Sequence, residues 1–372
     1  MNPSTSTTKP RVVVGMSGGV DSSVAAYLLK QQGYDVVGVT MKVWPQDCIS
    51  READKCCGPQ AIADARGVAH ALGIPHYVVD EAVNFERAVI DYFTAEYRAG
   101  RTPNPCVMCN EKVKFGNLWL KAKSVGAEFI ATGHYAIVDH FEDHAVLRRG
   151  VDPRKDQSYF LFSLRQEQLQ RALFPLGGME KPEIRRIARE IGLKTADKVD
   201  SQEICFVPGN DYKAFLRSHL GEKEFHPGRL RDKAGNDLGA HEGIELFTIG
   251  QRKGLPGGSA TPRYVIDIDP ESASVIVGDV EDLTVEEFEI DNVIWHECGS
   301  GEAPLLPFEA TVKIRYAHPG VAATIEPQGQ RARVRLHEPQ RAITPGQAAV
   351  CYRGDVVLGG GWICRQAALV TA

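Results

Sequence analysis

The feature that most constrains the fold is a glycine- and serine-rich loop, Gly15-Met16-Ser17-Gly18-Gly19-Val20-Asp21-Ser22-Ser23. An apolar run at residues 11–14 precedes it, and a helical pattern at residues 24–29 follows. This order predicts a strand, a tight turn and a helix. Glycines let the backbone turn sharply and approach a ligand, and a helix N-terminus presents N–H groups to an anion. We therefore predict a phosphate-binding loop after the first strand.

Three known loop types compete for this stretch. The usual P-loop requires a lysine just before the helix, and none is present. A Gly-x-Ser-x-Gly nucleophile elbow matches residues 15–19, but such an elbow normally lies deeper in a hydrolase sheet. The pattern Ser-Gly-Gly-x-Asp-Ser resembles the pyrophosphate loop of ATP pyrophosphatases, which grips the leaving pyrophosphate. A helix cap at Asp21 or Ser22 is also expected and is compatible with that function.

Length and composition set broad limits. The chain has 372 residues, which predicts two or three domains. Its formal net charge is −5, so contact with nucleic acid requires local basic patches. No apolar stretch is long enough for a membrane span, and the first ten residues form a polar tail that we expect to be disordered. We expect a cytoplasmic protein whose nine cysteines serve as thiols, ligands or catalysts.

The order of the elements predicts an α/β fold. Apolar runs at 35–41, 76–79 and 127–131 alternate with helical patterns at 59–72 and 85–99, which is typical of a doubly wound, mostly parallel sheet. Ligands bind at the carboxyl ends of such strands, so the first loop, Met41 and Gly133-His134 should surround one site.

The later chain predicts two smaller domains. Residues 208–282 are rich in glycine and turns, and from 283 onward short runs at 308–314, 321–325, 332–336, 348–352 and 356–358 predict an antiparallel β-barrel. We therefore divide the chain into a tail (1–10), a nucleotide-binding and catalytic domain (11–207), a central domain (208–282) and a C-terminal barrel (283–372).

A second motif carries cysteine chemistry. The run Asn104-Pro105-Cys106-Val107-Met108-Cys109-Asn110 predicts a fixed turn, with a helix over 111–125 starting just after it. That position would lower the pKa of Cys109 and make it nucleophilic. The Cys-x-x-Cys spacing allows a redox pair, half a zinc site or part of an iron–sulfur site, but no second Cys-x-x-Cys is present. Cys205 alone would be an ordinary buried thiol.

Together these motifs resemble the tRNA-specific 2-thiouridylase family. Further matches lie at residues 131–135, 155–161 and 248–254, and the resemblance runs from Val12 to about Trp362. It implies that ATP, with Mg²⁺, adenylates the wobble uridine of tRNA and that sulfur replaces its C2 oxygen, giving 2-thiouridine, AMP and pyrophosphate. The implied ATP-binding residues are Gly15, Met16, Ser17, Gly18, Gly19, Val20, Asp21, Ser22, Met41 and Gly133. That Asp21 lies near the Mg²⁺ is our own inference.

The resemblance also implies individual roles. Cys205 would carry a persulfide delivered by a sulfur-relay donor protein, and Cys109 would be the nucleophile, leaving a Cys109–Cys205 disulfide to be reduced. The target base would lie against Asn104, Pro105 and Cys106. The implied tRNA-binding residues are His134, Lys155, Asp156, Gln157, Arg315, Tyr316 and Gln347. The expected partners are tRNAs for lysine, glutamate and glutamine. We expect a monomer and no membrane contact.

Several alternatives stay open. Some family members have aspartate where this chain has Cys106, so Cys106, Cys109 and Cys205 could instead hold a [4Fe–4S] cluster; we favour the persulfide because of thiol reactivity. A different ATP-dependent adenylating ligase and a non-catalytic RNA-binding protein are further candidates. Basic residues between 148 and 198 are expected to contact the phosphate backbone. The roles of Cys48, Cys56 and Cys57 are open, and Cys298, Cys351 and Cys364 are interpreted as core thiols.

Overall fold

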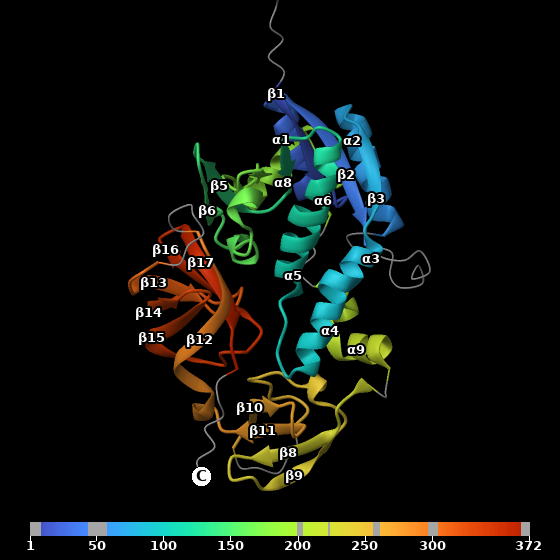
Figure 1. The fold of residues 1–372 in the computed structure, drawn as a ribbon. Coiled ribbons are helices and arrows are strands. Elements are labelled where there is room, and N and C mark those ends of the chain that lie inside the picture. Colours follow the sequence, from blue (N-terminus) through green and yellow to red (C-terminus); the bar gives the residue numbers. More distant parts are fainter. Residues whose placement is uncertain are drawn as a thin grey trace, which may run out of the picture. The chain divides into compact units, whose positions relative to one another are not determined.

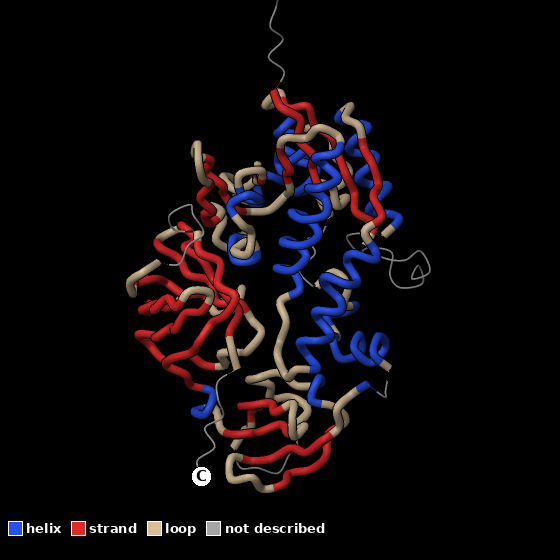
Figure 2. Tube along the Cα trace, viewed as in Figure 1, coloured by secondary structure: helices blue, strands red, loops and turns tan. Residues whose placement is uncertain are grey.

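The computed structural model describes residues 9–43, 58–198, 204–221, 224–255, 261–296 and 304–365. The chain forms two compact units. The sheet unit comprises Met1–Ala88, Cys106–Cys205 and Asp355–Val357, and the barrel unit comprises Val89–Pro105, Phe206–Gly354 and Leu358–Ala372. Each is considered separately below (Figures 1 and 2). The predicted tail up to residue 8 and Cys48, Cys56, Cys57 and Cys298 lie outside the described residues.

The sheet unit is built on five parallel strands. They are β1 (Lys9–Gly15), β2 (Tyr34–Lys42), β3 (His76–Asp80), β4 (Phe129–Ala131) and β7 (Ala172–Leu173), in the order β3-β2-β1-β4-β7. Every paired neighbour runs parallel. The predicted parallel sheet is therefore confirmed, and β1, which leads into the glycine-rich loop, lies at its centre.

Helices cover both faces of this sheet. α1 (Val20–Gln31), α2 (Pro59–Leu72) and α8 (Lys181–Glu190) share one buried cluster with Val12 and Val14 of β1. Val13 points to the opposite face and is 1% exposed, so that face is covered too. α6 (Leu118–Ser124) packs against β4. The unit also contains a β-hairpin, β5 (Ala136–His140) and β6 (Ala145–Arg149), η4 (Ser158–Phe160) and α7 (Gln166–Leu169).

Two predicted helices differ in detail from the structure. The pattern at 85–99 forms α3 (Ala82–Phe85), a π-helical stretch η2 (Glu86–Ile90) and α4 (Asp91–Arg98). The fixed turn expected at 104–110 was wrong from Pro105 onward, because a helix begins there and continues as α5 (Pro105–Met108), the π-helix η3 (Cys109–Asn117) and α6. Proline is tolerated in a first helical turn because its missing N–H would be unpaired there anyway.

The barrel unit contains a small central sheet. The short turn η5 (Pro208–Asn210) and α9 (Tyr212–Leu220) lead into β8 (Gly228–Asp232), β9 (Asp237–His241), η7 (Ile244–Leu246), β10 (Tyr264–Asp269) and β11 (Ser274–Gly278). The strand order is β10-β11-β8-β9. Leu230, Ile244, Val265 and Val275 are buried in its core.

A closed antiparallel barrel follows. After η8 (Glu281–Leu283), its strands are β12 (Thr284–Trp295), β13 (Phe308–Lys313), β14 (Val321–Gln328), β15 (Arg331–Arg341), β16 (Ala348–Arg353) and β17 (Val356–Ile363). The order is β12-β15-β14-β13-β16-β17, and β12 also pairs with β17. The predicted barrel is confirmed, but β12 was missed because glutamates interrupt its apolar pattern. Among the described residues, no helix combines the length and apolar character of a membrane span.

Candidate active site

The glycine-rich loop packs against α2 through backbone atoms. Gly18 has φ +71°, and a Cβ atom there would lie 2.3 Å from the Ala61 carbonyl oxygen. The φ value and the contact both require glycine. Met16 N donates to Val39 O at 2.8 Å, and Thr40 Oγ1 donates to Met16 O at 2.7 Å. The loop is therefore held between β2 and α2 by backbone contacts and by the Thr40 hydroxyl.

The serines of the loop brace its backbone. Ser23 Oγ donates to Gly19 O at 2.8 Å, and Ser17 N donates to Ser22 Oγ at 3.2 Å. Gly19 is the N-cap residue of α1, and no side chain caps the helix. The expected cap by Asp21 or Ser22 was therefore wrong, because both side chains bond elsewhere. The N–H groups of the first turn stay available to an anionic ligand.

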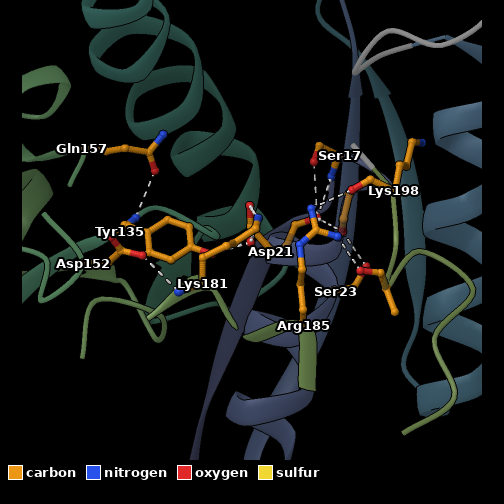
Figure 3. A network of polar contacts seen from close by, with 12 residues as sticks. Ser17, Asp21, Ser23, Tyr135, Asp152, Gln157, Lys181, Arg185 and Lys198 are labelled. Atoms are coloured by element: carbon orange, nitrogen blue, oxygen red, sulfur yellow. Dashed lines mark hydrogen bonds and ion pairs between the residues drawn. The ribbon is translucent and has the colours of Figure 1, made fainter. Parts of the chain in front are cut away.

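Asp21 is held by residues distant in the sequence. Lys181 Nζ donates to its two carboxylate oxygens at 2.8 and 2.9 Å, and the Tyr135 hydroxyl donates to Oδ1 at 2.6 Å (Figure 3). Gln157 Oε1 in turn accepts from Tyr135 N at 3.0 Å. The Lys181 side chain is only 9% exposed. Asp21 thus anchors α1 to the start of α8, a role that differs from the inferred proximity to Mg²⁺.

The segment after β4 packs directly on the loop. A Cβ atom at Gly133 would lie 2.7 Å from Ser22 N, so only glycine allows this approach. Met41 is half-buried and pairs with Val79 of β3. Both residues follow or end parallel strands, and the structure places Gly133 beside Asp21 and Ser22 as the topology predicts.

Two thiols of the sheet unit lie on the helix that begins at Pro105. Cys106 and Cys109 are half-buried, free thiols on α5 and at the start of η3. Lys114 lies five residues after Cys109, and its Nζ donates to Asn110 Oδ1 at 2.9 Å. Asn110 Nδ2 donates to Phe160 O at 3.0 Å. Gln168 Nε2 donates to the Glu111 and Phe115 carbonyls at 3.0 Å each, which satisfies carbonyl groups of the π-helix.

The expected acidity of Cys109 was wrong. Burial raises its pKa, and the nearby Lys114 charge lowers it only in part. The pKa of Cys106 is raised to about 11, chiefly by burial and then by Cys109. Because the helix starts at Pro105, Cys109 lies beyond its first turn and desolvation outweighs any favourable dipole. Both thiols are protonated at neutral pH in this structure.

Metal ligands are not assembled in the described conformation. Among the residues that the structure describes, no three His, Cys, Asp or Glu side chains form a group suited to a metal ion. Cys106, Cys109 and Cys205 all lie within the described part of the chain, so they do not form a three-thiolate set. Cys205 is half-buried.

Among the expected tRNA-binding residues of the sheet unit, His134 and Asp156 are buried, whereas Lys155 is half-buried. His134 is 8% exposed and packs near Phe115 and Phe174, and burial lowers its pKa well below the usual value. The Asp156 carboxylate is also buried and accepts from Gly150 N and Ser158 N. Lys155 is half-buried at the surface. These contacts give His134 and Asp156 structural roles.

An open hollow of about 560 Å³ lies beside the N-terminal end of α8. Its lining carries five basic side chains and one acidic one: Asp152, Arg154, Lys155, Lys181, Arg185 and Arg189, with Pro182. Ile184 and Ala188 of α8 are fully buried. Outside the hollow, Arg148 of the expected basic surface pairs with Asp139 and Asp355.

Of the three residues in the barrel unit that were expected to bind tRNA, Gln347 supports a loop. Gln347 Nε2 donates to Thr102 O and Pro103 O at 3.1 and 3.0 Å. These contacts hold the chain just before Asn104, which is 6% exposed, and Pro105, which is also buried. Arg315 and Tyr316 lie exposed just after β13. Sequence reasoning gave no role to Lys181 or Lys114, since no local motif marks them, and it placed Lys198 only among the basic residues expected to contact the phosphate backbone.

Comparisons with known proteins agree with this architecture. Family models match in three blocks: a tRNA methyl transferase HUP domain at residues 10–209, a tRNA methyl transferase PRC-barrel domain at 213–279 and an aminomethyltransferase β-barrel domain at 285–363. The chain is thus one of the proteins in which a HUP domain precedes two small barrels.

Relatives over the full length define the family more closely. The tRNA-specific 2-thiouridylase of Caldanaerobacter subterraneus is 53% identical, covering 96% of this chain and 98% of that protein. The one of Geobacter metallireducens is 50% identical, covering 95% and 97%. The chain belongs to the tRNA-specific 2-thiouridylase family. A solved 4-thiouridine synthetase–RNA complex with bound ATP is 20% identical over 51% of this chain and 43% of that one, with a TM-score of 0.33.

Proposed function

We propose that this protein uses ATP to adenylate the wobble uridine of tRNA and replaces the C2 oxygen with sulfur. The observation that carries this proposal is the open, glycine-built loop at the end of β1 in the same unit as Cys106, Cys109 and Cys205. Membership of the 2-thiouridylase family supports it. The family models are named for methyl transfer, but a pyrophosphate loop and buried thiols suit adenylation and sulfur transfer better.

The first step is adenylation. The uridine O2 attacks the α-phosphorus of ATP, an O–P bond forms, and pyrophosphate leaves with the bridging oxygen. The loop amides and the uncapped first turn of α1 stabilise the charge that develops on the leaving group. The described residues build no carboxylate cage for Mg²⁺, and Asp21 is occupied by Lys181. Mg²⁺ would therefore enter bound to the phosphates of ATP.

The second step is sulfur transfer. Cys205 carries a persulfide from a donor protein, and its terminal sulfur bonds to C2 of the adenylated uridine. Cys109 attacks the Cys205 sulfur, so a Cys109–Cys205 disulfide forms as the S–S bond to the transferred sulfur breaks. The C2–O bond breaks with release of AMP, and an external thiol reductant restores both cysteines. Because burial raises the pKa of Cys109, its thiol must lose a proton before this step.

The iron–sulfur alternative has weaker support. It needs Cys106, Cys109 and Cys205 to lie together as ligands, and the described residues contain no such group. A different adenylating ligase would not need the two cysteines at all, which makes their substitution decisive.

The hollow beside α8 is our proposed contact for the tRNA backbone. Arg154 and Lys155 both line the hollow, and Arg154 is exposed to solvent, so we propose that these two side chains meet the phosphates. Replacing either residue with alanine should weaken tRNA binding. It should also make the slope of log binding constant against log salt concentration shallower by about one. The exposed Arg186, which pairs with Glu190 and does not line the hollow, is the matched control. Unchanged salt slopes in both variants would rule out this contact.

The test of the main proposal separates its two steps. Unmodified tRNA is incubated with protein, Mg²⁺-ATP and a persulfide donor, and nucleosides are analysed by mass spectrometry alongside pyrophosphate release. Wild type should yield 2-thiouridine. Cys109→Ser should release pyrophosphate but form no thiolated nucleoside, whereas the half-buried Cys364→Ser in the barrel unit should behave as wild type.

Two results would overturn parts of this scheme. Thiolation that persists in Cys109→Ser and Cys205→Ser would remove the cysteine mechanism. Absence of tRNA-dependent pyrophosphate release in wild type would remove adenylation. If thiolation is seen only with protein handled anaerobically, and is lost in Cys106→Ala, the iron–sulfur alternative would be favoured.

A further inference from the structure

The pyrophosphate loop contains no lysine, yet a lysine reaches it from far along the chain. Lys198 Nζ lies 2.8 Å from Asp64 Oδ2 and 3.4 Å from the Gly18 carbonyl oxygen. Figure 3 shows its side chain in the same network as Ser17 and Ser23. In loops of the P-loop type, the lysine adjoining the helix contacts the β- and γ-phosphates. The corresponding place beside this loop is thus occupied by a residue 180 positions away.

We propose that Lys198 supplies the phosphate-binding cation of the pyrophosphate loop, and that Asp64 holds it in place until the pyrophosphate of ATP displaces the carboxylate. This inference rests on the proposed use of ATP. It adds a specific residue for the β- and γ-phosphates and a resting partner for that residue.

The backbone that carries Lys198 is held by α8. Arg185 donates to the Ala196 carbonyl at 2.7 Å and to the Lys198 carbonyl at 3.0 Å. Arg189 adds an ion pair with Asp197 at 2.8 Å. Since Ile184 of the same helix is fully buried in the cluster shared with α1, these arginines fix the segment relative to the loop. The Lys198 side chain can therefore move while its backbone stays in place.

Asp64 is similarly positioned on α2. Gln60 Nε2 donates to Asp64 Oδ1 at 2.8 Å, and Ala61, in the preceding turn of α2, lies against Gly18. Burial raises the pKa of Asp64, but hydrogen bonds from Lys198 and Gln60 and the Lys198 charge outweigh it, so the net pKa is lowered. The Asp64 carboxyl is therefore ionised at neutral pH. Asp64 thereby provides the negative charge that an arriving phosphate would replace.

The exposure of this pair separates it from a purely structural one. The side chains of Lys198 and Asp64 are 33% and 22% exposed, so a ligand can reach them. Lys181 by contrast is 9% exposed and bonds to both oxygens of Asp21. A pyrophosphate carries more negative charge than one carboxylate and offers more acceptor oxygens, so it competes well for the Lys198 ammonium.

Calorimetric titration with inorganic pyrophosphate, and with Mg²⁺-ATP, tests the proposal without tRNA. Lys198→Met should weaken pyrophosphate binding on the order of 10- to 100-fold, the loss expected for one charge-assisted bond. Lys198→Arg should recover part of it. Asp64→Asn should have the opposite effect and tighten pyrophosphate binding several-fold, because the carboxylate that competes for Lys198 is removed. Lys194→Met, an exposed lysine four residues before Lys198, is the matched control and should bind as wild type.

Lys198→Met and Asp64→Asn are expected to change the affinity for pyrophosphate in opposite directions, so the proposal can be tested even if either variant is less stable. A structural salt bridge would give equal losses of melting temperature in Lys198→Met and Asp64→Asn with unchanged affinity per folded molecule, and that result would overturn the inference. If wild type binds pyrophosphate through Lys198 but yields no 2-thiouridine, the proposed function fails and the inference stands. If thiolation is intact while Lys198→Met keeps its affinity and its KM for ATP, the inference alone fails.

Discussion

The pyrophosphate loop and the cysteine helix (residues 105–117) both carry sequence motifs, but they depend on their surroundings to different degrees. The loop acts through backbone N–H groups, and its shape follows from Gly18 and from its position after β1. The cysteine helix presents side-chain thiols whose pKa values are raised by burial. The structure therefore preserves the predicted chemistry of the loop and revises that of Cys109.

This difference reflects the physics of the two groups. A backbone amide stays a hydrogen-bond donor in any environment, so glycine spacing and a following helix are enough to predict an anion site. A thiol is nucleophilic only as a thiolate, and burial disfavours the charged form. Motifs built from backbone are consequently more reliable predictors than motifs built from titratable side chains.

The largest expected effect comes from adding a side-chain atom to the loop at Gly18. In Gly18→Ala the added Cβ atom would lie 2.3 Å from Ala61 O at a φ of +71°, so the loop must shift. ATP-dependent pyrophosphate release should fall on the order of 100-fold, as expected when reacting groups are displaced by about 1 Å. Gly178→Ala, where the added atom meets nothing within 4 Å, is the control. Equal rates in the two variants would contradict the importance of the loop shape.

The anchor of α1 should give the next largest effect. Asp21→Asn leaves the Lys181 ammonium, 9% exposed, without its charge partner. Unfolding by urea should show a loss of about 2 to 3 kcal/mol, below the value for a fully buried pair because Asp21 is 31% exposed. Adding Lys181→Met should restore part of the stability. A changed Mg²⁺ requirement with unchanged stability would instead assign Asp21 to the metal.

A smaller effect is expected in the cysteine helix. Asn110 donates to Phe160 O and accepts from Lys114, and it is 2% exposed. Asn110→Ala should cost about 1 to 2 kcal/mol of unfolding free energy, because the Phe160 carbonyl loses its donor. Chemical denaturation measures this change. No change would show that water replaces the amide and that the helix does not depend on it.

The smallest expected change concerns the pH dependence of the thiol. Burial raises the pKa of Cys109 and Lys114 partly offsets this, so removing the lysine raises the pKa further. Because only the thiolate reacts, alkylation of Cys109 should rise with pH, and Lys114→Met should move that rise to higher pH. Lys112→Met, an exposed lysine paired with Glu111, should leave the profile in place. A shift to lower pH would contradict the role of the Lys114 charge.

Much of the fold could be predicted from the sequence because hydrophobic periodicity is local. The parallel sheet, α2 and five barrel strands follow from apolar runs and turn residues. The strand β12 was missed since its alternating glutamates hide the apolar face. The π-helical stretches η2 and η3 have no sequence signal, and the cysteine helix begins at Pro105, earlier than the predicted helix over 111–125.

The sequence by itself determined the position of the phosphate loop, the family and the cysteines that could carry sulfur, because these depend on residue types at short spacings. Only the tertiary structure decided which cations serve the loop. Lys181 and Lys198 lie 160 and 180 residues from their partners Asp21 and Gly18, and α8 brings them there by burying Ile184 and Ala188. Charge pairing across such distances follows from packing, and packing is a property of the whole fold.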